Sequence, residues 1–127
     1  MVSTLIDACK NIVHLIKDVR EQEKERKLKV SEVLFEISNI LTDTSNQINE
    51  GTYPHGNCVL MQRLAEKLHL VLDGITDPED NEKLKTILLE SSNLEQEYAN
   101  REDPATIQQL ERAGAEFKAM AILMTIV

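Results

Sequence analysis

The sequence contains no tryptophan, and only 3% of its 127 residues are aromatic. A core must therefore come from the leucine, isoleucine, valine, methionine and alanine that dominate its hydrophobic 42%. These side chains are typical of helix bundles, because unbranched and γ-branched side chains lose little rotamer freedom in a helix. A chain of this length buries roughly two-thirds of its unfolded surface. We therefore expect a single domain over residues 1–127 that folds without disulfides or metals.

Cysteine is also scarce, since Cys9 and Cys58 are the two present and they have no CxxC spacing. Two cysteines are too few for a disulfide framework and suit a reducing compartment. The first residues lack the basic region and apolar run of a signal peptide, and no run approaches the roughly eighteen apolar residues that span a bilayer. We expect a cytoplasmic protein without a membrane span.

Positive charge is in short supply, and the formal net charge is -8. This balance argues against nucleic acid as a partner, because lysine and arginine supply most of the non-specific affinity for phosphates. Between Asp73 and Asp103 lie 10 acidic and 3 basic residues, so nearly all of the excess is in that segment. The simplest interpretation is a solvated helix face, and the alternative is an acidic surface that binds a basic protein.

Catalytic and ligand-binding motifs are missing as well. The sequence has no glycine-rich phosphate loop, nucleophile elbow or series of zinc ligands. Each of these motifs positions a reacting or liganding group, so their joint absence favours a protein that is not an enzyme and has no cofactor or metal.

Apolar residues recur with alternating spacings of four and three, which indicates helices with one buried face. The first run starts at Thr4, and the second extends from Val30 to Ile48. The spacing continues without a phase shift through the charged residues between them, so one helix over 4–50 that exchanges with a second chain in a dimer is possible. Because compact domains favour short connections, we expect a hairpin near Lys24 to Leu28 instead.

The segment from Gly51 to Cys58 excludes helix, since Pro54 has no amide donor and restricts Tyr53. Gly51 is predicted to follow a helix end, and Asn57 is predicted to cap the next helix. That helix carries a seam of Leu60 or Met61, Leu64, Leu68 and Val71 and ends at Gly74. Asp77-Pro78 and Asp103-Pro104 predict two further helix starts. The sequence thus predicts an all-α fold, an antiparallel bundle of four or five helices.

The last predicted helix changes character along its length. Ala113-Gly114-Ala115 offers a surface of small residues that another backbone can approach closely, and residues 119–127 are almost wholly apolar around the circumference. Such a helix end must be buried on all sides, in the centre of the bundle, against another chain or at a membrane surface. Its candidate interaction residues are Phe117, Met120, Leu123, Met124 and Ile126.

The turn holds the other candidates, Tyr53, His55 and Cys58. The Tyr53 hydroxyl can bind a partner, or the ring can cover the bundle end. His55 and Cys58 are three residues apart, and a cysteine at a helix N-terminus has its thiolate favoured by the helix dipole. The structural interpretation is a turn histidine and a small buried hydrophobe.

These observations together predict a non-catalytic protein–protein interaction module that forms a homo-oligomer through apolar helix faces. The alternative is an acidic immunity protein or antitoxin-type inhibitor that covers a basic partner by electrostatic complementarity. A further alternative is a metal- or redox-active bundle that uses His55 and Cys58.

Overall fold

The computed structural model describes residues 24–72 and 94–126, together with the single positions 7, 79, 82 and 86. The helices are α2 (Lys24–Asn49), α3 (His55–Leu72), α5 (Leu94–Ala99) and α6 (Pro104–Ile126). No strand occurs within these ranges. The predicted all-α bundle is therefore confirmed. The predicted first helix lies outside the described residues apart from the helical, exposed Asp7, and so do the expected boundaries at Gly74 and Asp77-Pro78.

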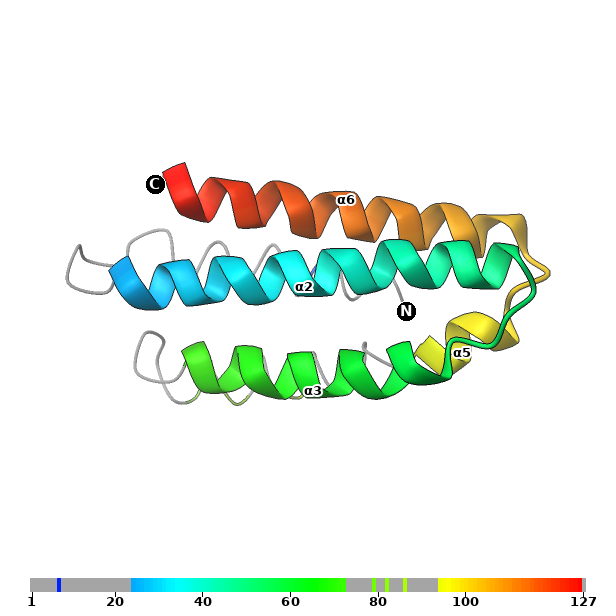
Figure 1. The fold of residues 1–127 in the computed structure, drawn as a ribbon, viewed down its shortest axis with the longest axis horizontal. Coiled ribbons are helices and arrows are strands. Elements are labelled where there is room, and N and C mark those ends of the chain that lie inside the picture. The colour runs from blue at the N-terminus through cyan, green and yellow to red at the C-terminus, as the bar shows by residue number, and fades with distance from the viewer. Residues whose placement is uncertain are drawn as a thin grey trace.

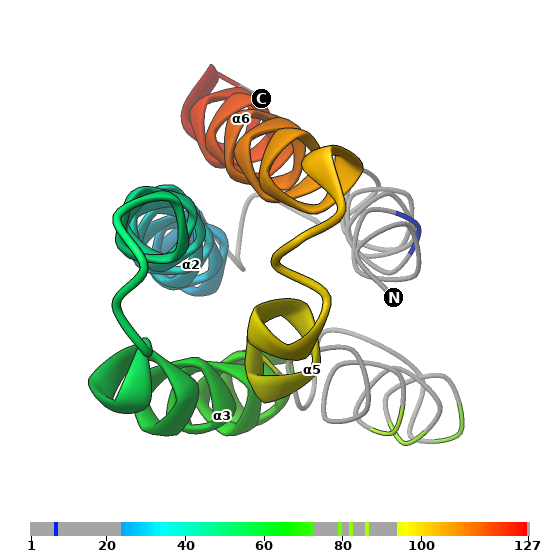
Figure 2. The same cartoon turned by 90° about the vertical axis from the view of Figure 1, so that its right-hand side faces the viewer.

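Helix α2 is the middle element of the described bundle. In Figure 1 it lies between α6 and α3 and runs antiparallel to both, and the short α5 lies beside the start of α3. Figure 2, which looks along the helices, separates α2, α3, α5 and α6 around a shared interior. Among the described helices, the most extensive contact is between α2 and α6.

The seam predicted for α2 faces this interior. Val30, Ile37 and Leu41 are completely or almost completely buried, and Ile40 packs partly buried against the core. The hairpin expected at Lys24 to Leu28 is wrong, because these residues are the first turns of α2. Lysine, arginine and glutamate favour helix, so nothing in this stretch stops it. Lys27 is itself buried, which extends the inward face by one turn.

The end of α2 confirms the role predicted for Gly51. Gly51 has φ 81°, in the left-handed region that favours glycine. Its N–H donates to the Ile48 carbonyl at 3.0 Å, and the Thr52 N–H donates to the Gln47 carbonyl at 2.8 Å. This pair of bonds is a Schellman motif, which satisfies carbonyls at the helix end.

The start of α3 differs from the sequence prediction. The Pro54 carbonyl accepts the first helical hydrogen bond, from the Cys58 N–H at 3.0 Å, so α3 begins at His55. The expectation that Asn57 caps this helix is wrong. The fixed φ of Pro54 is compatible with the start of a helix. The Asn57 side-chain amide does not cap the helix and instead donates hydrogen bonds to residues of α2.

Helix α6 begins where the Asp-Pro signal predicts. Pro104 is its first residue, and Asp103 Oδ1 accepts a hydrogen bond from the Ala105 N–H at 3.0 Å. Asp103 is thus the N-cap, and Pro104 occupies a position where its missing N–H has no helical partner to lose.

Small residues allow α2 and α6 to approach closely. The Ser38 hydroxyl donates to the Gly114 carbonyl at 2.7 Å, and the Ser31 hydroxyl donates to the Ala121 carbonyl at 2.6 Å. A Cβ added to Gly114 would lie 2.8 Å from Thr42 Oγ1 and 3.3 Å from the Ser38 carbonyl oxygen. The close approach predicted at Ala113-Gly114-Ala115 is confirmed, and the backbone that approaches is α2 of the same chain.

We predict opposite effects of alanine at Gly51 and at Gly56. Gly51→Ala should lower the free energy of unfolding by about 1–2 kcal/mol, because the new side chain must adopt the left-handed conformation. Gly56→Ala is the matched control, since a Cβ at either glycine meets no atom within 4 Å. It should be neutral or stabilising by up to about 1 kcal/mol. Urea unfolding measures both, and an equal effect at the two positions would contradict the prediction.

We also predict that Gly114→Ala destabilises the bundle through its contact with Thr42. The added methyl group should lower the free energy of unfolding by about 1–2 kcal/mol. Overpacking against Thr42 destabilises the fold, and the better helix propensity of alanine offsets part of this loss. Thr42→Ala removes the atom 2.8 Å away. The penalty should therefore shrink by about 1 kcal/mol in that background. An undiminished penalty in the double variant would show that α2 and α6 are not this close.

Candidate interaction sites

A polar cluster joins α2 to the start of α3. The Asn57 amide donates to Asp43 Oδ2 at 2.9 Å and to Thr44 Oγ1 at 3.0 Å, and the Thr44 hydroxyl donates to the Ile40 carbonyl at 2.6 Å. Gln47 also donates to Asp43 Oδ2, at 2.8 Å. Asn57 and Thr44 are buried, so these bonds satisfy groups that would otherwise lose water without compensation. The cluster fixes how α3 meets α2.

Tyr53 covers the end of the bundle beside α5. Its ring meets the Tyr98 ring edge-on, with centroids 4.8 Å apart, and the Arg101 guanidinium lies 4.3 Å from the centroid of the Tyr98 ring. Edge-to-face rings and a cation over a ring are both favourable contacts. Tyr53 keeps 41% of its surface exposed. It therefore fastens the turn to α5 and still presents part of its ring outward.

The Cys58 thiol is in an environment that disfavours its ionised form. Burial raises the pKa of Cys58, the Glu95 carboxylate raises it further, and a hydrogen bond from the Tyr53 hydroxyl opposes this only in part. Burial and the Glu95 carboxylate thus outweigh the stabilisation of the thiolate that is expected from the helix N-terminus. Cys58 is instead a buried member of the hydrophobic core.

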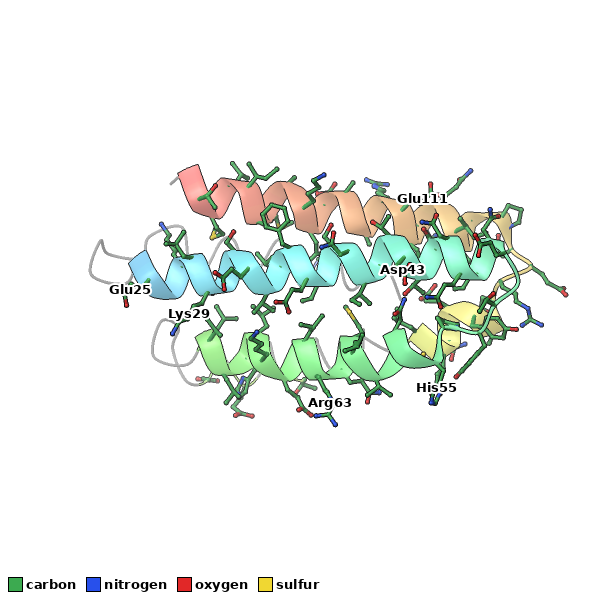
Figure 3. All side chains as sticks on the ribbon, in the orientation of Figure 1. Glu25, Lys29, Asp43, His55, Arg63 and Glu111 are labelled. Atoms are coloured by element: carbon green, nitrogen blue, oxygen red, sulfur yellow. The ribbon has the colours of Figure 1, made fainter. Side chains whose placement is uncertain are left out.

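His55 is at the surface of the bundle, whereas Cys58 is buried. The His55 side chain is exposed, and its ring centroid is 6.3 Å from that of Tyr53. Figure 3 shows His55 on the outward side of α3. Within the described residues, no group of three or more histidine, cysteine, aspartate and glutamate side chains is placed to hold a metal ion.

The candidate residues in the C-terminal half of α6 differ in burial. Phe117, Met120 and Met124 are buried at 0%, 6% and 4% exposure, so they belong to the core and are not available to a partner. Leu123 is 46% exposed, and its neighbour Ile122 is 42% exposed. The Ile126 side chain lies outside the described residues. The last turns of α6 thus carry apolar side chains on the side that packs into the core and also on the opposite side, which is exposed to solvent.

A second set of exposed apolar residues lies on α3. Of the two alternatives for its seam, Met61 is buried and Leu60 is 47% exposed. Val59 and Leu70 are exposed too, with the charged Arg63 on the outward side between them (Figure 3). Nearby, Lys67 Nζ lies 3.9 Å from Glu36 Oε1, with both side chains about half exposed. This surface could not be predicted from the sequence, because Leu60 and Met61 fit the helical spacing about equally well.

None of the described helices is both long and apolar enough to cross a membrane. No known protein family, curated protein or solved structure matches the chain. The function must therefore be inferred from the residues themselves.

Glu97 generates a prediction on pH. It is 5% exposed, and burial raises the pKa of its carboxyl above the usual 4.5. Its contribution to stability should be fully present below about pH 4.5 and be lost as the pH rises through the raised pKa of the folded state. Glu97→Gln should remove this loss, so the variant gains stability relative to the parent between pH 4 and pH 7. Thermal unfolding across this range measures the gain, with the exposed Glu102→Gln as control. A constant difference between parent and Glu97→Gln would contradict the assignment.

Proposed function

We propose that the chain is a non-catalytic cytoplasmic interaction module that associates with a second copy of itself. The observation that carries the proposal is the exposure of Ile122 and Leu123 at the end of a helix whose opposite side is already packed. Contiguous exposed apolar residues mark association surfaces more often than scattered ones do.

Charge supports the same surface. Two copies that each carry a net charge of -8 repel one another, so they associate best where charge is sparse or balanced. Residues 119–127 contain no charged residue. From Ala113 onward, α6 carries one acidic and one basic side chain, Glu116 and Lys118. This surface therefore carries little net charge to oppose the approach of a second copy.

Small residues on the same side of α6 favour contact with another helix. Ala115 and Ala119 are exposed, and they lie seven and three residues before Ile122, which is helical spacing for one face. Alanine on an outward face lets a second helix approach closely, while larger side chains at the end supply apolar area.

We predict that polar substitution at this end separates the copies. Ile122→Gln with Leu123→Gln should raise the dissociation constant of the dimer roughly a thousandfold, for a loss of about 1 kcal/mol of apolar burial at each of the four substituted residues in the two copies. Helical content should not change, because both side chains already face solvent. Sedimentation velocity across a dilution series measures the constant.

The matched control is Leu70→Gln on α3, which removes a leucine that is 69% exposed. It should leave the dissociation constant unchanged. If the parent chain sediments as a monomer of 14.4 kDa at every concentration, the proposal fails. If Leu70→Gln alone separates the copies, self-association stands but uses α3.

A further inference from the structure

Four charged side chains of α6 are spaced so that acidic residues lie opposite basic ones when a second α6 is placed beside the first in the antiparallel direction. They are Glu111, Arg112, Glu116 and Lys118, of which Glu116 is partly exposed and the other three are exposed. Within the described chain none of the four is joined to another side chain by an ion pair. Glu111 points outward from α6 in Figure 3.

These charges line two edges of one outward face. Glu111 and Lys118 lie three residues before and four residues after Gly114, so helical spacing puts both on the edge next to α2. Arg112 and Glu116 are four residues apart and lie along the opposite edge. Between the edges are the exposed Ala115 and Ala119.

The centres of the two edges lie within half a residue of each other along α6. The midpoint between residues 111 and 118 falls between Gly114 and Ala115, and the midpoint between residues 112 and 116 falls on Gly114. In a two-fold antiparallel pair of helices, each edge meets the same edge of the partner, and residues equidistant from the axis face each other. Glu111 would then face Lys118 of the second copy, and Arg112 would face Glu116, each twice.

The apolar residues agree with the same centre. Ile122 and Ile107 are equidistant from a point between Gly114 and Ala115, and Leu123 and Ala105 are equidistant from Gly114. Ile107 and Ala105 are partly exposed, so each has surface left to cover. The exposed Ile122 and Leu123 would thereby be covered at both ends of a face about 27 Å long, at 1.5 Å per residue.

We infer that the second copy lies antiparallel along the outward face of α6, with the two-fold axis beside Ala115, and that opposite charges on both edges fix this register. The inference rests on the proposed self-association and adds its surface, orientation and register. Charge complementarity sets which register forms, because every shift of one turn along the helix brings the acidic residues out of line with the basic ones.

The first test is a charge-exchange cycle. Lys118→Glu places like charges opposite each other at two symmetric positions and should raise the dissociation constant about tenfold at low salt. Glu111→Lys in the same chain restores opposite charges, so the double variant should return to within about threefold of the parent. Arg63→Glu on α3 is the control, because it makes the same change of two charge units away from the face. It should shift the constant less than about threefold. All variants are measured at low and high salt, since screening should reduce the effect of Lys118→Glu.

The second test locates the axis by cysteine crosslinking. In a background with Cys9→Ser and Cys58→Ala, Ala115→Cys should form a disulfide between copies under mild oxidation, because residues beside the axis have Cα atoms within about 7 Å. Ala119→Cys is the control. Its two copies would be displaced along the helices by about nine residues, or about 13 Å, so they should not crosslink.

The outcomes separate the inference from the proposed function. A parent chain that stays monomeric at all concentrations overturns both. A parent dimer in which Glu111→Lys and Lys118→Glu add rather than compensate, or in which Ala119→Cys crosslinks faster than Ala115→Cys, overturns the register and leaves self-association standing. Circular dichroism of each variant establishes that it is folded, and a cysteine variant that does not fold leaves the charge-exchange cycle to decide.

Discussion

The close contact between α2 and α6 is the constraint on which the rest of the described structure depends. Ser31 and Ser38 are seven residues apart on α2, and the carbonyls they bind, those of Ala121 and Gly114, are seven residues apart on α6. A serine can be buried in such a seam because its hydroxyl finds a backbone acceptor, and Gly114 leaves room for α2 to come near enough to supply it. Larger side chains in the seam would push the two helices apart.

This contact determines which sides of the other elements remain free. Because α2 packs α6 on one side and α3 on the other, its inward positions are filled within the chain, and the Asn57 bonds hold α3 in place. Helix α6 contributes Phe117, Met120 and Met124 to the core and has its charged and small residues on the far side. The association surface that we propose is therefore the side of α6 that does not pack against the core.

The helix boundaries could be predicted from the sequence wherever a residue is compatible with few backbone conformations. Gly51 and Asp103-Pro104 were predicted correctly because a left-handed position and a first-turn proline leave few alternatives. The seam serines were missed because polar residues interrupt an apolar pattern, and their acceptors lie 76 and 90 residues away in the sequence. The Cys58 environment could not be predicted either, since Glu95, which is 37 residues away in the sequence, reaches it only through tertiary folding.

The central claim is that α6 is packed on both sides, by α2 within the chain and by α6 of a second copy. The most direct measurement is a search for intermolecular nuclear Overhauser effects in a sample that mixes isotopically labelled and unlabelled chains. The account predicts such effects between the Ala115 methyl groups of the two copies, and between Ile122 of one copy and Ile107 of the other. Intermolecular effects confined to Val59, Leu60 and Leu70 on α3, or none at millimolar concentration, would contradict it.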